Sequence, residues 1–219
     1  MISHFHQELE QLKMKILEMA ALAERSLEKA SRALFERDAE LAEEIIQGDQ
    51  EINLMEVAID RQILRLLALD QPMARDLRFI VGCLRMSLDL ERIGDQAVNI
   101  AERAQYLSGR EPLRPIPAME ELADTAMIML KVALGAFVNL NADQAVEVCQ
   151  MDDIADELNV QVLQDLMEYM VNDTPAIQRA VQTIITARCL ERVADHATNI
   201  AESVVFIDKG VNIKHHCEQ

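Results

Sequence analysis

Two segments of the chain place oxygen-bearing side chains at helical spacing. Residues 90–102 read LERIGDQAVNIAE and residues 190–202 read LERVADHATNIAE, with nine of thirteen positions identical. A helix advances about 100° per residue, so Asp95 and Asn99 lie about 40° and 80° around the helix from Glu91. The corresponding side chains of the second segment are Glu191, Asp195 and Asn199. Acids stacked at this spacing repel each other by roughly 0.2–0.5 kcal/mol per pair, so each segment requires a compensating cation or arginine.

Further polar residues stand upstream of each segment, namely Asp49 and Asn53 before the first and Asp152 and Asp156 before the second. In an antiparallel hairpin that turns near residues 70–72, Asp49 and Asp95 are each about 22–24 residues from the turn, and therefore lie at similar height on neighbouring helices. The same count around Thr174 places Asp152 level with Asp195. Each hairpin is therefore expected to gather polar side chains from two helices.

Such sets of oxygen donors suit hard cations such as Mg²⁺, Ca²⁺ or Mn²⁺, and carboxylate-rich helices also bind iron. The candidate metal ligands are Asp49, Asn53, Glu91, Asp95, Asp152, Asp156, Glu191 and Asp195. The alternative is a solvated acidic face neutralised by nearby arginines, among them Arg92, Arg103 and Arg192. The spacing leaves both interpretations open, and the duplication of the pattern favours the metal.

Motifs typical of enzymes are missing from the sequence. It contains no glycine-rich phosphate loop, no GxSxG and no HExxH. The Glu-x-x-His pair of di-iron oxidases is absent from both repeated segments. His196 follows Asp195 directly, but its counterpart in the first segment is Gln96, so we expect it to be a surface or supporting residue rather than a ligand. The protein is therefore not expected to be an enzyme.

The composition indicates an all-helical protein. Of 219 residues, 50% are hydrophobic but only 3% are aromatic, and glycine and proline are scarce. A net charge of −17 argues against binding to nucleic acid or to an anionic membrane, and favours protein partners and cations. The four cysteines are scattered, and three of them, Cys83, Cys149 and Cys189, are expected to be buried thiols in a reducing compartment. With no signal peptide and no long apolar run, a cytoplasmic location without membrane insertion is expected.

Apolar residues recur at helical spacing and predict six long helices, with Asp38 and Asn141 as N-caps and Thr174–Pro175 opening the last helix. Three of the five prolines lie in residues 108–118, which we interpret as a linker. The fold class predicted is all-α, with two tandem, pseudo-symmetric three-helix bundles. The expected helices are 4–36, 38–69, 72–106, 119–140, 141–171 and 174–208. The expected domains are a first three-helix repeat at 1–109, a linker at 110–118, a second repeat at 119–208 and a loose tail at 209–219.

The paired LERIGD…N and LERVAD…N segments resemble the signature of the PhoU family, the regulators associated with phosphate-specific transport. QGDQEINLMEVAID (residues 47–60) is similar to that family's second-helix motif, and QPMARDLR (residues 71–78) to the start of its third helix. The resemblance covers residues 5–208 in two repeats. Either motif alone would be weak, but their combination is specific.

The resemblance implies two similar three-helix bundles, often in homodimers, and multinuclear iron or zinc bound through Glu/Asp-xxx-Asp motifs. Mg or Mn would also suit the donors. Carried over residue by residue, the metal motifs are Glu91/Asp95 and Glu191/Asp195, with Asp49 and Asp152/Asp156 opposite them. Asn53 stands where the second repeat has Asp156, which predicts a weaker first site.

The resemblance also implies a negative regulator of the phosphate-starvation response. Its partners would be the ATPase subunit of the phosphate transporter and a membrane sensor histidine kinase. Two alternatives stay open: a metal-dependent hydrolase of phosphate compounds, and a metal-free helical scaffold.

Overall fold

The computed structural model describes residues 4–48 and 50–213, and in these residues every regular element is a helix. The first half contains α1 (His4–Glu36), α2 (Ala39–Gly48), α3 (Gln50–Asp70) and α4 (Ala74–Ser108). The second half contains α5 (Pro117–Asn139), α6 (Ala142–Asn172), a short 3₁₀ turn (Thr174–Ala176) and α7 (Ile177–Lys209). The predicted all-α class is thus confirmed.

The helix boundaries follow local capping chemistry. The Asp38 carboxylate accepts hydrogen bonds from the backbone N–H groups of Glu40 (3.1 Å) and Leu41 (2.9 Å). Asn141 does the same for Asp143 (3.1 Å) and Gln144 (3.2 Å). Both predicted N-caps therefore exist, and each satisfies backbone donors that the first helical turn leaves unpaired.

The helix ends agree with the expected ones to within two residues, apart from two larger differences. The single helix predicted over residues 38–69 is described as two, α2 and α3, on either side of residue 49. Thr174 does not cap α7 directly, because Thr174–Ala176 forms a 3₁₀ turn and the α-helix begins at Ile177. The proline at position 175 has no N–H to donate, which suits the first turn of a helix of either kind.

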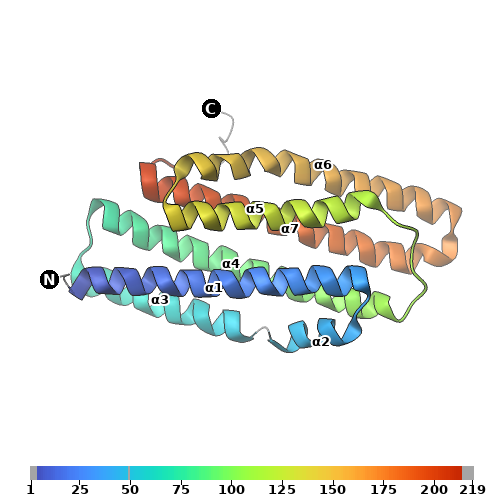
Figure 1. Cartoon of the computed structure of the whole chain (residues 1–219), viewed down its shortest axis with the longest axis horizontal. Coiled ribbons are helices and arrows are strands. Elements are labelled where there is room, and N and C mark those ends of the chain that lie inside the picture. Colours follow the sequence, from blue (N-terminus) through green and yellow to red (C-terminus); the bar gives the residue numbers. More distant parts are fainter. Residues whose placement is uncertain (1–3, 49, 214–219) are drawn as a thin grey trace.

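The two halves lie side by side, with their long helices roughly parallel to one axis (Figure 1). Contacts between the halves are made by α4 with α7, which carry the repeated segments, and by α1 with α5. Small residues on α4 and α7 are fully buried, which favours close packing of both helices in the core. These residues are Ala97, Ala101, Ala197 and Ala201.

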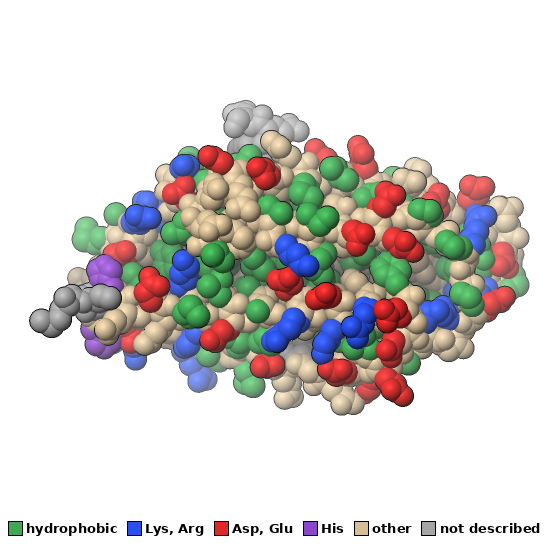
Figure 2. All heavy atoms as spheres, viewed as in Figure 1, with side chains coloured by type: hydrophobic (Ala, Val, Ile, Leu, Met, Phe, Trp, Pro, Cys, Tyr) green, Lys and Arg blue, Asp and Glu red, His purple; other side chains and the backbone are tan. Residues whose placement is uncertain are grey.

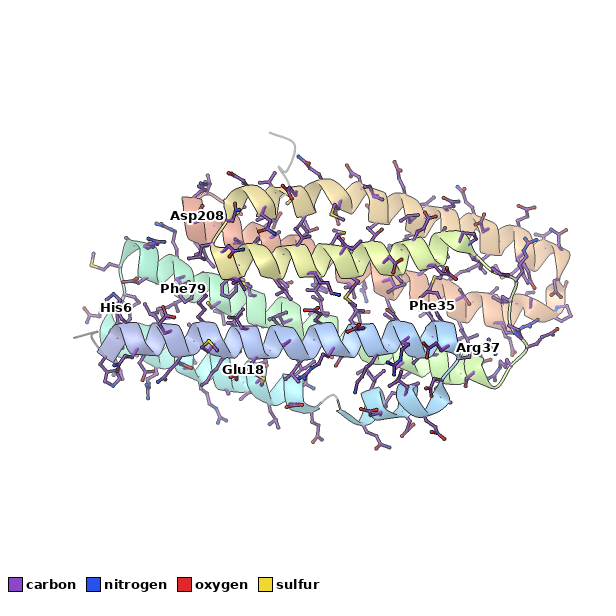
Figure 3. All side chains as sticks on the ribbon, in the orientation of Figure 1. His6, Glu18, Phe35, Arg37, Phe79 and Asp208 are labelled. Atoms are coloured by element: carbon purple, nitrogen blue, oxygen red, sulfur yellow. The ribbon has the colours of Figure 1, made fainter. Side chains whose placement is uncertain are left out.

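Side chains from all four of these helices join the halves. Phe79 of α4 stacks on Phe137 of α5 with ring centroids 6.2 Å apart (Phe79 is labelled in Figure 3). Lys13 of α1 donates to the Val138 carbonyl at 3.2 Å. A Cβ placed on Gly82 of α4 would collide with the buried Ile207 side chain of α7, so glycine at this position lets the two helices approach closely. One continuous hydrophobic core therefore runs through both halves.

The surface is acidic on the face seen in Figure 2, where Asp and Glu side chains are spread between hydrophobic ones and extend along the upper edge, over α6. No helix of the described residues has the length and apolar character needed to cross a membrane. The three cysteines predicted to be buried, Cys83, Cys149 and Cys189, are buried and form no disulfide among the described residues, and Cys217 lies outside those residues.

Candidate metal-binding site

The second hairpin, α6 with α7, brings its predicted acids together. Asp152 of α6 is half-buried and accepts a hydrogen bond from the Thr198 hydroxyl of α7 at 3.2 Å. Burial raises the pKa of Asp152, and the charges of Asp195 and then Asp156 raise it further, while the Thr198 hydrogen bond lowers it. Asp152 and Asp195 therefore lie close enough to repel each other, as the residue count around Thr174 predicts.

Glu191 is the most enclosed acid of this group, with 6% of its surface exposed. One carboxylate oxygen, Oε1, accepts from Arg188 Nη1 at 2.9 Å. The other, Oε2, is buried and has no hydrogen-bond partner in the structure. Burial raises the pKa of Glu191, Asp195 raises it further, and Arg188 opposes the shift. A buried carboxylate oxygen with no donor is costly, which indicates a place for a missing positive group.

Asp195 completes the cluster. Burial raises its pKa, and the negative charge of Asp156 adds to this, while His196 and Arg188 lower it. Asp152, Asp156, Glu191 and Asp195 are thus four mutually repelling acids at one level of the hairpin. In their described conformations, however, no three His, Cys, Asp or Glu side chains anywhere in residues 4–48 and 50–213 are arranged to hold a metal ion.

The first hairpin neutralises its acids differently. Arg92 lies between Glu91 (Nε to Oε2, 3.4 Å) and Asp95 (Nη1 to Oδ2, 3.2 Å). This is the arginine partner that the alternative interpretation requires. Glu102, further along the same helix, pairs with the adjacent Arg103. Asp49, the predicted acid on the opposite helix, lies outside the described residues.

Asn53 of α3 is half-buried and sits next to Ile52, which packs against α4. A Cβ placed on Gly94 would lie 2.9 Å from Ile52 Cδ1. Residues 52–53 are therefore level with residues 94–95, as the hairpin count predicts. At the corresponding contact of the second half, Ala155 and Ala194 replace Ile52 and Gly94. Two small side chains there take the place of one large side chain opposite a glycine.

A third polar contact, which the sequence did not reveal, joins the two halves. Asp89 of α4 accepts from Asn199 Nδ2 at 3.3 Å and lies 3.0 Å from His196 Nδ1, both on α7. The expectation that Asn199 shares the stripe of Glu191 is wrong, because its side chain turns towards α4. His196 is likewise held by Asp89. Asn199 and His196, about 80° and 140° around the helix from Glu191, thus face the neighbouring helix and not the hairpin partner.

At the positions that correspond to Asp89 and His196 in the other repeat, a cavity takes the place of the hydrogen bond. There Cys189 and Gln96 occupy the positions that correspond to Asp89 and His196. They border a cavity of about 410 Å³, into which Asn99 and Leu163 also face. Gln96 Oε1 is buried without a hydrogen-bond partner. The repeat symmetry of the sequence is thus broken where α4 meets α7.

The donor chemistry of the second hairpin suits a cation, but its side chains would have to turn from their described conformations to converge on one ion. Its acids supply carboxylate oxygens, one of them buried and unpaired, and a positive ion would relieve their mutual repulsion. Asp152, Asp156, Glu191 and Asp195 would hold it. In the first hairpin Glu91 and Asp95 would have to release Arg92 to serve as ligands. The donors are oxygens only, which suits hard cations and iron.

Comparison with known proteins identifies the family. The PhoU domain model matches residues 16–104 and 119–204, which are the two repeats. The chain belongs to the PhoU family. The accessory protein PhoU homolog of the phosphate-specific transport system from Aquifex aeolicus is 40% identical, over 95% of this chain and 94% of the relative. The corresponding Pseudomonas putida protein is 38% identical, over 96% of this chain and 83% of the relative.

Solved PhoU structures have the same fold. The crystal structure of PhoU from Pseudomonas aeruginosa superposes with a TM-score of 0.91 at 38% identity, and covers 95% of this chain and 100% of that one. The phosphate transport system regulatory protein PhoU from Streptococcus pneumoniae gives a TM-score of 0.88 at 31% identity, with coverage of 95% and 99%. The likeness therefore spans both PhoU repeats and includes their relative placement.

Proposed function

We infer that this PhoU family member is a cytoplasmic, non-enzymatic negative regulator of phosphate uptake and of the phosphate-starvation response. It acts through contacts with the ATPase subunit of the phosphate transporter and with a membrane sensor histidine kinase, and it works as a homodimer. The observation that carries this proposal is the family match over both repeats, together with relatives named as accessory and regulatory proteins of phosphate transport.

Metal ions on the carboxylates are part of the proposal. A cation on Asp152, Asp156, Glu191 and Asp195 would neutralise the acidic level of the α6–α7 hairpin and so change the charge that a partner meets. Two features support this role: the unpaired Oε2 of Glu191 and the raised pKa values of three of the acids. The first hairpin binds more weakly, because Arg92 already neutralises Glu91 and Asp95.

Gene deletion tests the regulatory role. A strain that lacks this protein is expected to express phosphate-starvation genes in phosphate-rich medium, and a plasmid copy is expected to restore repression. A reporter such as secreted alkaline phosphatase measures both. Normal repression in the deletion strain would contradict the proposal. Sedimentation of the purified protein tests the dimer.

Elemental analysis tests the metal. Purified wild-type protein is expected to contain iron or zinc, with Mn or Mg as the alternatives, and Asp195→Asn is expected to lose more metal than Asp95→Asn. Equal loss from the two variants would contradict the proposed difference between the hairpins. The rival hydrolase predicts turnover of phosphoesters that needs added metal and disappears in Asp195→Asn. The rival scaffold predicts no stoichiometric metal and no change in stability with a chelator.

A further inference from the structure

Helix α6 carries an apolar stripe on its exposed side. Val160, Leu163, Met167 and Val171 are 50%, 40%, 54% and 83% exposed. At about 100° per residue these four side chains lie within about 80° of one another around the helix. The stripe is distinct from the buried face of α6, which Ala155, Val162 and Leu166 form. Single exposed apolar residues are ordinary, but a row along three turns marks an interaction surface.

The neighbouring helix extends this surface. Ile177 and Val181 of α7 are each 40% exposed, and with Ile184 they form a stripe of their own at helical spacing. Leu163 and Ile184 border the same cavity between α4, α6 and α7, so the two stripes meet there, beside Arg188 and Arg192. We name the combined patch the hairpin surface, defined by Val160, Leu163, Met167, Val171, Ile177 and Val181.

The charge of α6 is entirely of one sign. Residues 142–172 contain no Lys, Arg or His. Glu157 and Glu168 lie about 60–80° to one side of the apolar stripe, and Asp153 and Asp156 continue its line towards the start of the helix. Asp156, Glu157 and Asp165 border a hollow of about 760 Å³, together with Val160 of the stripe and with Arg188 and Glu191 of α7. The stripe is thus edged by acids along one side and at one end.

The corresponding helix of the first half lacks this pattern. On α3 the exposed residues Leu54, Val57 and Leu64 also form a row, but Arg61 and Arg65 stand among them. Their counterparts on α6 are Gln164 and Glu168. The repeat therefore provides two helices of similar shape and apolar exposure but different charge.

We propose that the hairpin surface binds a basic amphipathic helix of a protein partner. Such a helix presents apolar side chains at i, i+3, i+4 and i+7 to the stripe and Lys or Arg to the acids at its edge. Symmetric pairing of α6 with the α6 of a second copy suits the surface poorly, since it would oppose like charges. The proposal rests on the proposed function, because it locates one docking site of a regulator that acts by protein contact.

A designed peptide of about four turns tests the surface directly. The probe is a fluorescently labelled helix with Leu on one face and Lys elsewhere, and anisotropy measures its binding. The comparison peptides are a scrambled sequence of the same composition and a Leu/Glu helix. Wild-type protein is expected to bind the Leu/Lys helix, more tightly at low salt, and to bind the scrambled peptide at least about tenfold more weakly.

Protein variants then locate the site. Leu163→Gln with Met167→Gln on α6 is expected to weaken binding about tenfold or more, since central apolar contacts dominate such interfaces. The matched control, Leu54→Gln with Leu64→Gln on α3, is expected to bind as wild type does. Glu157→Gln with Glu168→Gln is expected to weaken binding and to reduce its dependence on salt. Circular dichroism and thermal unfolding check that each variant is folded.

Three results would overturn the proposal: equal effects of the α6 and α3 pairs, equal binding of the scrambled peptide, or preference for the Leu/Glu helix. Conversion of a wild-type oligomer to monomer by Leu163→Gln with Met167→Gln would show a subunit interface instead. The reporter strain separates this question from the function. If the wild-type gene and the Leu163→Gln, Met167→Gln gene both restore repression fully, the hairpin surface is not a docking site, but the regulatory function still holds. If the wild-type gene itself fails to restore repression, the regulatory function is wrong.

Discussion

At the scale of single residues, the contact between Ile52 and Gly94 sets how closely α3 approaches α4. Gly94→Ala adds a Cβ 2.9 Å from Ile52 Cδ1, and Ile52 is only 3% exposed, so it has little room to move. We expect overpacking of about 1–3 kcal/mol to exceed the roughly 1 kcal/mol that alanine gains over glycine in a helix. Urea unfolding should therefore show a net loss of about 1 kcal/mol.

The sign should reverse when Ile52 is shortened. In an Ile52→Ala background, Gly94→Ala is expected to stabilise by up to about 1 kcal/mol, because only the helix propensity remains. This double variant copies Ala155 and Ala194 of the second half. Gly135→Ala is the control, since its only close neighbour is the end of the Gln144 side chain at 3.3 Å. A loss from Gly94→Ala in both backgrounds would show that Ile52 is not the cause.

Asp195 makes a second prediction at this scale, for the metal-free protein. Its raised pKa means that the fold disfavours the charged form, so the stability it contributes is present when it is protonated. That contribution is lost as pH rises from about 4 through the raised pKa. Asp195→Asn is therefore expected to raise the free energy of unfolding at neutral pH by about 0.5 kcal/mol, the size of a like-charge helical pair.

The same substitution should flatten the fall in stability that begins near pH 4 and continues as pH rises through the raised pKa, measured by urea unfolding with a chelator present. Asp95→Asn serves as the repeat-matched control. Asp95 is paired with Arg92 at 3.2 Å, so its replacement is expected to bring no gain. A clear loss of stability in metal-free Asp195→Asn at neutral pH would rule out repulsion as the dominant effect.

At the scale of elements, Arg37 fastens the end of α1 to the end of α4. Its guanidinium donates to the carbonyls of Leu107 (2.5 Å), Ser108 (3.2 Å) and Arg110, and Figure 3 shows Arg37 beside the connection to α5. Arg37→Ala should cost about 2 kcal/mol, because charged hydrogen bonds to part-buried carbonyls are lost. Arg32→Ala, which removes only an exposed pair with Glu36 at 3.7 Å, should cost less than about 0.5 kcal/mol.

Urea unfolding of the two arginine variants provides the test. Similar losses from Arg32→Ala and Arg37→Ala would mean that the anchoring of α1 to α4 contributes little. Because a non-glycine residue with φ of 60° is uncommon, Arg37→Gly adds a useful comparison. It relaxes the backbone while removing the same hydrogen bonds, so it should lose less stability than Arg37→Ala.

Much of this element structure could be predicted from sequence, because it depends on local rules. Helical spacing of apolar residues indicated the long helices, and Asp38 and Asn141 act as the expected caps. Counting residues from each turn placed Asp152 level with Asp195 correctly, since helix rise is constant. The rotation of one half against the other follows no such rule. For that reason the contact of Asp89 with His196, and the inward turn of Asn199, were missed.

The candidate site shows the same division. Spacing identified which acids share a level, but not which arginine reaches them. Arg92 neutralises the first set, whereas in the second Arg188 binds only one oxygen of Glu191. The position corresponding to Arg188 in the first half is Leu88, and Arg192, the counterpart of Arg92, lowers the pKa of both Glu191 and Asp195 through its charge, so the two sets differ in their arginine partners. Side-chain choices of this kind depend on the neighbouring helices, and a single repeated motif does not determine them.

At the scale of the whole molecule, the contact of Asp89 with His196 and Asn199 joins the two halves across α4 and α7. His196→Ala leaves a mostly enclosed Asp89 carboxylate with one donor fewer. We expect a loss of about 1–2 kcal/mol in the free energy of unfolding, with a single transition retained because the core is continuous. Differential scanning calorimetry and urea unfolding measure both quantities.

The cavity beside Cys189 and Gln96 allows the contact between Asp89 and His196 to be copied at the corresponding positions of the other repeat. Cys189→Asp alone should destabilise the protein, because it places a charge in a buried position beside Gln96. Adding Gln96→His supplies the ring that His196 provides on the other side, so the double variant should recover at least about 1 kcal/mol in a double-mutant cycle. The cavity of about 410 Å³ leaves room for the larger side chains. Additive effects of the two substitutions would show that the contact between Asp89 and His196 cannot be transferred to the corresponding positions. The cavity would then reflect a difference in how α4 and α7 pack near Gln96 and Cys189.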